Sequence, residues 1–306
     1  MLDILGKRYI FFAISALLII PGLIIMAIWG LPLSIDFQGG TLLDISFASG
    51  QVPSTEQVIN IYNQNGVTDA KPTTTEDGMQ IRSSFMEEST RADIIEALQA
   101  ETGDTITVNR ADSVGPTIGR EVTSRAILAV AAAALAVILY ITLAFRGVQH
   151  SLRYGICAII AMIHDVLVVI SLAAIGGQLF GWQVDSLFLT ALLSVIGFSV
   201  QDKVVVFDRI RENSAIYRRL PFETLANHSI VQTLQRSINT QLMTVEYMLL
   251  ALALFGGVTL REFAIILLVG LFMGTYSSIF IAAPILVIWE NKEWKNWFGR
   301  KAETAA

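Results

Sequence analysis

Six ionisable side chains lie inside or at the edges of long apolar runs: His164, Asp165, Asp202, Lys203, Arg236 and Glu246. A charged group inside a lipid bilayer is costly, so residues of this kind usually face a partner, a cavity or an ion pathway. Carboxyl and imidazole groups can take up and release a proton, and a nearby basic group favours the charged form of a carboxylate. These side chains are therefore candidates for a functional role within a membrane.

Asp202 is the strongest of these candidates. The long Lys203 and Arg236 side chains can reach a membrane surface while their stems stay in lipid. His164 can be a neutral packing residue that makes a hydrogen bond. The short Asp202 side chain cannot reach water in this way, and further polar residues stand beside it. We therefore expect a functional role for Asp202, with Asp165 and Lys203 as polar support or as further members of a relay.

Glu246 needs a partner, or must stay protonated, if it lies inside the membrane. At about 1.5 Å per residue, His164 and Glu246 both lie roughly 15 Å past the basic residues Arg153 and Arg236, respectively, that precede them. We expect Glu246 to bond His164, Gln241 or a group of a partner protein. The alternative is a neutral Glu246 that faces lipid, and Lys203 is expected too close to the inner surface to reach it.

Other kinds of chemistry have no motif in this sequence. We find no metal-ligand spacing, no pairing of nucleophile and base, and no phosphate-binding glycine loop. We therefore predict no metal, no cofactor and no enzymatic activity. The net charge of −5 argues against nucleic-acid binding, which usually needs a basic surface.

The composition is that of a membrane protein: 54% of the 306 residues are hydrophobic and 15% are charged, against about 25% charged in soluble proteins. Crossing the hydrocarbon takes about 20 mostly apolar residues. Six runs are long enough, so we predict six transmembrane helices: Tyr9–Trp29, Ser124–Phe145, Tyr154–Ile175, Gln183–Phe207, Ile238–Phe255 and Phe263–Trp289. The first run is too long for an ordinary signal peptide and no small-residue cleavage site follows it, so we expect an uncleaved anchor.

The basic residues predict the orientation, because cytoplasmic loops carry the excess of Lys and Arg. The short loops near 176–182 and 256–262 hold only Arg261, and most of the other basic residues near the runs fall on the opposite side. We therefore predict a multi-pass protein of the cytoplasmic membrane with both termini in the cytoplasm. The long segment between the first two runs is then outside.

That segment has the composition of a soluble domain. Thr41–Phe47 alternates apolar and polar residues as a strand does, and Ser54 with Gln57 forms a capping box that begins a helix. Further strands are expected near 67–75, 79–85 and 105–110, with a turn at Asp77-Gly78 and a second helix that begins near Thr90. The order β-α-β-β-α-β predicts a small α+β ferredoxin-like domain. We expect a packed scaffold or a docking domain.

The chain thus divides into four parts. Residues 1–30 form the cytoplasmic N-terminus and transmembrane helix 1, and residues 31–123 form the periplasmic domain and its linker. Residues 124–290 contain transmembrane helices 2–6, and residues 291–306 form a cytoplasmic tail. In the last helix, small residues favour close helix packing: Gly270, Gly274, Ser277 and Ser278.

Several motifs, in order along the chain, resemble those of the SecF family of bacterial protein-export subunits, which is related to transporters of the resistance-nodulation-division superfamily. Residues 196–213, IGFSVQDKVVVFDRIREN, resemble its signature at the fourth span, and His164-Asp165 stands where the family has His-Asp. Residues 227–236 and 274–279 resemble its fifth and sixth spans, and 114–119 its exit from the periplasmic domain. The junction before that domain resembles the family's Asp-Phe-Thr-Gly-Gly, here Asp36, Phe37, Gln38, Gly39 and Gly40.

The resemblance implies a function and partners. It implies an accessory subunit that, with SecD, uses the proton-motive force to promote polypeptide export across the cytoplasmic membrane. Asp202 is then the proton carrier and Arg236 its partner or gate, and the 36–40 motif is a hinge-like join. The implied partners are SecD as a heterodimer, the SecYEG translocon, membrane subunits similar to YajC and YidC, and the translocating polypeptide.

Besides Gln38, the chain departs from the family pattern at four positions. The family usually has Asn-Asp-Thr or Asn-Asp-Ser where this chain has Gln201, Asp202 and Lys203. It usually has Ser where Gln241 stands and an apolar residue where Glu246 stands. The added Lys203 and Glu246 change the local charge balance.

Two other functions remain open, as does the coupling ion, which can be a proton or sodium. The first is a non-conducting assembly subunit that only holds the translocase together. The second is a small-molecule exporter of the same superfamily, although about 80 residues are few for the large periplasmic region of such pumps.

Overall fold

The computed structural model describes residues 3–75, 78–146, 151–241, 247–255 and 257–293. The chain forms two compact units. The helical unit comprises Met1–Leu31, Val130–Trp182 and Leu187–Ala306, and the sheet unit comprises Pro32–Ala129 and Gln183–Ser186.

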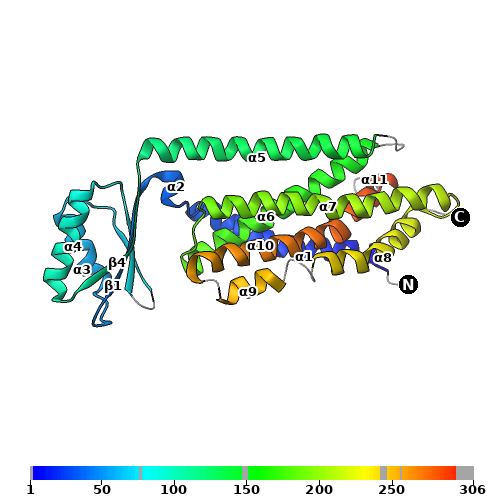
Figure 1. The fold of residues 1–306 in the computed structure, drawn as a ribbon. Helices are drawn as coiled ribbons and strands as arrows, with labels where there is room; N and C mark the ends of the chain where they lie inside the picture. The colour runs from blue at the N-terminus through cyan, green and yellow to red at the C-terminus, as the bar shows by residue number, and fades with distance from the viewer. Residues whose placement is uncertain (1–2, 76–77, 147–150, 242–246, 256, 294–306) are drawn as a thin grey trace, which may run out of the picture. The chain divides into compact units, whose positions relative to one another are not determined.

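The helical unit is built from helices of differing length, most of them apolar (Figure 1). They are α1 (Arg8–Trp29), α5 (Pro116–Ala144, whose first turns belong to the sheet unit), α6 (Ser151–Phe180), α7 (Ser186–Ile216), α8 (Phe222–Gln241), α9 (Tyr247–Phe255), α10 (Gly257–Ser277) and α11 (Ala283–Glu290). Among the described residues, five helical segments are long and apolar enough to cross a membrane: Leu5–Trp29, Pro116–Ala144, Leu152–Phe180, Ser186–Ile216 and Leu260–Glu290. The run expected at 238–255 falls on the end of α8, on α9 and on residues 242–246, which lie outside the described residues.

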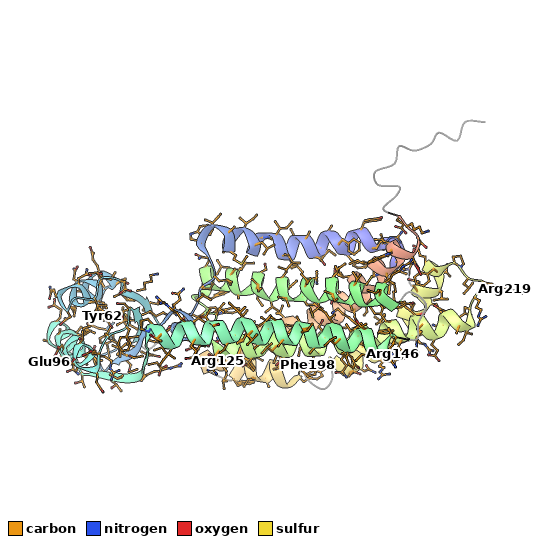
Figure 2. The ribbon with its side chains drawn as sticks, turned by 90° about the horizontal axis from the view of Figure 1, so that it is seen from above. Tyr62, Glu96, Arg125, Arg146, Phe198 and Arg219 are labelled. Atoms are coloured by element: carbon orange, nitrogen blue, oxygen red, sulfur yellow. The ribbon has the colours of Figure 1, made fainter. Side chains whose placement is uncertain are left out.

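The helices differ in how far they are buried in the protein. About half of the apolar window is buried in α6, in α7 and in the segment from α10 to α11, whereas only 6% is buried in α5. Apolar side chains such as Phe198 on α7 remain exposed (Figure 2), as expected for surfaces that lipid or a partner covers. Helix α6 packs against α1 and α10, and the only cysteine of the chain, Cys157, is buried in it.

A π-helical turn, η3 (Ser278–Ala282), interrupts the last long helix between α10 and α11. Pro284 follows this turn at the start of α11. Proline has no backbone N–H and cannot continue the α-helical ladder to the residue four positions earlier, Phe280. The sequence therefore gives a local reason for an irregular turn here, and π turns are frequent at functional sites.

Ion pairs join helix ends within the helical unit. Arg8 at the start of α1 contacts Glu223 of α8 at 2.6 Å and Glu293, after α11, at 2.9 Å. Arg153 of α6 forms an ion pair with Glu290 of α11. These ion pairs link the ends of α1 and α8, and those of α6 and α11, and they connect α1 to the residues just after α11.

The sheet unit contains a four-stranded antiparallel sheet and helices on one face of it. Its elements are α2 (Ile35–Gln38), β1 (Gly40–Phe47), α3 (Thr55–Gln64), β2 (Lys71–Thr74), β3 (Gly78–Ser83), α4 (Glu88–Thr102) and β4 (Ile106–Val114). The strand order is β2-β3-β1-β4, with Leu43 opposite Ile81 and Ala111. From β1 onward, strands and helices follow one another as expected from the sequence.

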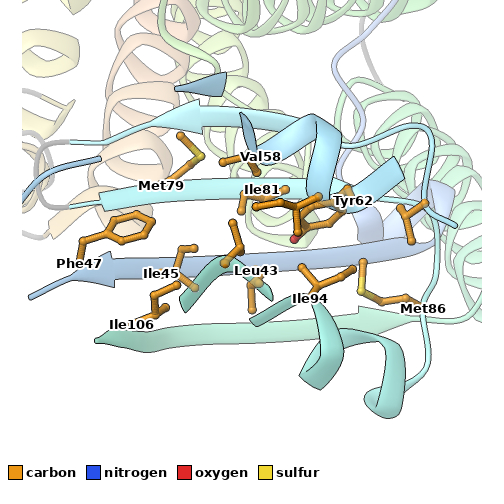
Figure 3. Packing of buried hydrophobic residues seen from close by; sticks show 13 residues of the cluster. Leu43, Ile45, Phe47, Val58, Tyr62, Met79, Ile81, Met86, Ile94 and Ile106 are labelled. Atoms are coloured by element: carbon orange, nitrogen blue, oxygen red, sulfur yellow. The ribbon is translucent and has the colours of Figure 1, made fainter. Parts of the chain in front are cut away.

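The core of the sheet unit lies between the sheet and helices α3 and α4 (Figure 3). Leu43 and Ile45 of β1 pack against Val58 and Tyr62 of α3 and Ile94 of α4. Alternate residues of a strand point to one face, which explains how a strand with a polar pattern can still line a core.

Capping decides where the helices of this unit begin. The predicted capping box is present: the Ser54 hydroxyl accepts from the Gln57 N–H, and Gln57 accepts from the Ser54 N–H at 2.9 Å. Helix α4 begins at Glu88, two residues before the expected Thr90, because an acidic residue in the first turn suits the helix dipole. The predicted Asp77-Gly78 turn lies partly outside the described residues.

Candidate functional site

Asp165 of α6 is the centre of a cluster of buried polar groups inside the helical unit. Its carboxylate is 1% exposed and accepts four hydrogen bonds. Lys203 Nζ (2.7 Å), Ser277 Oγ (2.8 Å) and Ser199 Oγ donate to Oδ2, and His164 Nδ1 lies 3.0 Å from Oδ1. Such a set of donors stabilises a charged carboxylate away from water.

Lys203 is completely buried, and its ammonium group is the ionic partner of Asp165. It also donates to the backbone carbonyl of Ser199, one turn earlier on α7, at 3.3 Å. The interpretation that Lys203 reaches the membrane surface is therefore wrong. The side chain is held inside the protein because Asp165 compensates its charge.

Asp202, the neighbour of Lys203 on α7, is 6% exposed and contacts different groups. The two hydrogen bonds that its carboxylate accepts come from hydroxyls, Ser237 Oγ at 2.7 Å and Ser278 Oγ at 2.5 Å. Asp165 and Lys203 cancel each other's charge. An ionised Asp202 would therefore carry the net charge of the cluster, and its donors among the described residues are neutral hydroxyls.

Helix α8 supplies Ser237 to Asp202, and not the expected Arg236. Arg236 is exposed, and within the described part of the chain no ion pair joins it to Asp202. Consecutive helix residues point about 100° apart, so the two side chains cannot both face α7. From the sequence we expected the charged Arg236 to be the partner of Asp202, but the hydroxyl of its neighbour Ser237 makes the contact.

His164 is 8% exposed, and its ring stacks on Tyr276 with centroids 6.3 Å apart. Its Nδ1 is bonded to Asp165, while its Nε2 is buried without a hydrogen-bond partner among the described residues. The expected contact with Glu246 is not tested, because Glu246 and the Gln241 side chain lie outside the described residues.

Small residues bring α10 close to α7 at the cluster. A Cβ atom added to Gly274 would lie 3.2 Å from Ser199 Cα, and one added to Gly270 would meet the Val195 side chain. Ser277 and Ser278, which follow on the same segment, are fully buried and donate to Asp165 and Asp202, respectively. The sequence suggested Ser277 and Ser278 only for helix packing, but in the structure they are hydrogen-bond donors to the two buried carboxylates.

The motif at 36–40 lies in the sheet unit and forms a compact junction. Gly39 and Gly40 have φ angles of 77° and 136°, which favour glycine. Cβ atoms there would lie 2.9 Å from Pro116 Cα and 2.6 Å from the Ser83 carbonyl oxygen. The buried Phe37 follows Asp36, and Gln38 ends α2. In the described residues, no group of three or more His, Cys, Asp or Glu side chains could hold a metal ion.

Comparisons with known proteins agree with this architecture. The sequence model for "Protein export membrane protein SecD/SecF, C-terminal" matches residues 94–292, and the "SecD/SecF GG Motif" matches residues 24–50. A protein translocase subunit SecF from Anaerolinea thermophila is 72% identical over the full length of both chains. One from Thermobaculum terrenum is 46% identical over 100% of this chain and 99% of its own.

The fold is also similar to that of solved proteins. A crystal structure of SecDF, a translocon-associated membrane protein from Thermus thermophilus, matches with a TM-score of 0.81 and 31% identity. The match covers 95% of this chain but 39% of the SecDF chain, so this chain corresponds to about two-fifths of that protein. Identity, coverage and fold agree, and the chain therefore belongs to the SecF family of protein translocase subunits.

Proposed function

We propose that this chain works with SecD as an accessory subunit that uses the proton-motive force to promote polypeptide export. Asp202 takes up the proton from one side and releases it to the other, and Arg236 gates this exchange from the exposed face of α8. Moving one charge through 100 mV is worth about 2.3 kcal/mol, enough to shift a two-state helix arrangement severalfold.

The charge balance of the cluster is the observation that carries the proposal. Asp165 has a buried ammonium partner at 2.7 Å, whereas within the described part of the chain the Asp202 carboxylate accepts hydrogen bonds only from Ser237 and Ser278. Adding a proton to Asp202 makes the whole cluster neutral. Adding one to Asp165 would instead leave the buried Lys203 without its counter-charge, which is strongly unfavourable.

The proposal includes the arrangement in the membrane. Residues 238–255 form a further span, the fifth in chain order, which brings the total to six, and both termini are cytoplasmic. The sheet unit is a periplasmic domain of the ferredoxin-like type, because β-α-β-β-α-β with the order β2-β3-β1-β4 corresponds to that fold. Partners beyond SecD are the SecYEG translocon and subunits similar to YajC and YidC.

Asp202→Asn tests the carrier role in membrane vesicles that contain the protein and its partner. The amide fills the same space but cannot exchange a proton, so export stimulated by the proton-motive force should fall at least tenfold. Asp208→Asn is the matched control, because Asp208 lies on the same helix, is exposed and pairs with Arg211. It should export within twofold of the wild type.

Normal export by Asp202→Asn, with the proton-motive force present, would contradict the proposal and favour a non-conducting assembly subunit. Arg236 is tested separately with Arg236→Ala and Arg236→Lys. If the gate needs only a positive charge, export should be lost in Arg236→Ala and retained in Arg236→Lys. Equal export by both variants and the wild type would remove Arg236 from the mechanism.

A further inference from the structure

Asp36, the first residue of the junction motif, accepts two hydrogen bonds from the first residue of α7. The Ser186 N–H and hydroxyl donate to the same Asp36 oxygen at 3.0 and 2.8 Å. The first N–H groups of a helix have no partner within the helix, and a negative charge at this end is favoured by the helix dipole. A side chain 150 residues earlier in the sequence thus supplies a cap to α7.

Backbone hydrogen bonds reinforce this contact. The Ser34 N–H donates to the Val184 carbonyl at 2.9 Å, and the Val184 N–H donates to the Pro32 carbonyl at 2.8 Å. Ser34 is buried and also caps α2 by accepting from the Asp36 N–H. These two bonds form a parallel β-bridge between Leu33, before the sheet, and Val184, before α7.

The other end of the motif is packed against the start of α5. A Cβ on Gly119 would lie 2.6 Å from the Gly39 nitrogen. The Thr123 hydroxyl donates to the Phe37 carbonyl at 2.9 Å. Strand β1 begins directly after Gly39. Within the sheet unit the motif is accordingly a close-packed corner that joins β1 to the first turns of α5 and to Ser186, and not a loose hinge.

We propose that Asp36 is a positioning residue that transmits movement of α7 to the sheet. This inference rests on the proposed function, since α7 is the helix that carries Asp202. Ser186 and Asp202 lie on one continuous helix and are separated by about 24 Å along its axis. A shift of α7 that accompanies protonation reaches Ser186 and then passes through the Asp36 carboxylate to β1.

Asp36→Leu and Asp36→Asn separate this role from general stability. Leucine has a similar size but no acceptor, whereas the asparagine oxygen can still accept from Ser186. In vesicles with the partner, Asp36→Leu should lower the export that depends on the proton-motive force about fivefold. This is the factor by which an equilibrium constant changes when a typical helix cap is lost. Proton flux should stay within twofold of the wild type, and Asp36→Asn should retain export.

Ser54→Ala is the matched control, because it removes the side-chain cap of α3 in the same unit without touching α5 or α7. It should lower thermal stability about as much as Asp36→Leu but leave export unchanged. Three results would overturn the inference: normal export by Asp36→Leu, an equal loss of flux and export in that variant, or an export defect in Ser54→Ala.

Hydrogen exchange distinguishes a failure of this inference from a failure of the proposed function. In Asp36→Leu the Ser186 amide of the full chain should exchange about fivefold faster, whatever ion the protein carries. Unchanged exchange would show that Asp36 does not hold α7. Normal export and flux in Asp202→Asn would instead contradict the proposed function alone.

Discussion

Ser277 and Ser278 are neighbours in the chain, yet their hydroxyls bind carboxylates that belong to two different helices. Ser277 Oγ donates to Asp165 of α6 at 2.8 Å, and Ser278 Oγ donates to Asp202 of α7 at 2.5 Å. Ser278 is also the first residue of the π-helical turn. The same backbone segment therefore supplies a donor to each of the two acids.

The two serines should differ in their effect on export. Ser278→Ala leaves Asp202 with the single hydroxyl donor Ser237, whereas Ser277→Ala leaves Asp165 with three donors. A hydrogen bond to a charged group is worth about 1.5–3 kcal/mol. We expect Ser278→Ala to lower force-dependent export about tenfold and Ser277→Ala to lower it less than threefold, in the same vesicle assay. A larger defect in Ser277→Ala would contradict this ranking.

Lys203→Met should strongly destabilise the helical unit, because it leaves the buried Asp165 without its counter-charge. Removing one partner of a buried ion pair costs about 3–5 kcal/mol. Replacing Asp165 by Asn as well should restore most of the loss. Thermal unfolding of both single variants and of the double variant in detergent measures this coupling. A single Lys203→Met variant as stable as the wild type would show that the pair does not matter for folding.

Tyr62→Phe should leave the sheet unit equally stable or make it more stable. The Tyr62 hydroxyl is buried without a hydrogen-bond partner among the described residues, and burial raises its pKa, so it stays neutral. An unsatisfied buried polar group costs about 1–3 kcal/mol. The thermal midpoint of the full chain reports the change, and Tyr62→Leu, which loses ring volume, should lower it. A clear loss of stability in Tyr62→Phe would reveal a partner for the hydroxyl.

Asp104 should make part of the stability depend on pH. The Ser49 hydroxyl, together with the Ser49 N–H, donates to the Asp104 carboxylate and holds the pKa of Asp104 below its usual value. A lowered folded-state pKa stabilises the protein above the unfolded value of about 3.9, and the gain disappears as the pH falls below it. Ser49→Ala should therefore lower the thermal midpoint at pH 6, and this difference should shrink as the pH falls below about 3.9. In an Asp104→Asn background the pH dependence of this difference should vanish.

Local sequence signals predicted much of the fold. The Ser54 and Gln57 capping box depends on residues three positions apart, and it formed as expected. The apolar runs located the long helices, but α5 and α7 extend beyond the runs at their ends. Polar residues past the hydrocarbon can continue a helix in water, so composition marks the membrane-crossing part and not the helix ends.

The candidate site was only partly predictable. Asp202 could be identified because a short carboxylate in an apolar run is unusual. The pairing of Lys203 with Asp165 joins residues 38 apart in the sequence, and it depends on how α6 and α7 face each other. The hydroxyl donors from α8 and from the π turn have no charge to mark them. A signal was present in Ser237, Ser277 and Ser278, since hydroxyls in apolar helices need acceptors, but the sequence does not say which ones.

Cys157 gives the protein a property that is useful for measurement. It is the only thiol in the chain, and it is buried inside α6. A cysteine introduced at an exposed position such as Gln64 would then be the only thiol within reach of a water-soluble reagent. A second one at the exposed Arg219 (Figure 2) would sample the loop after α7. Asn213 is less suitable, because it is buried and bonded to Ser229. The side of the membrane on which each introduced cysteine lies, and the distance between two labelled cysteines, can thus be measured on the otherwise native sequence.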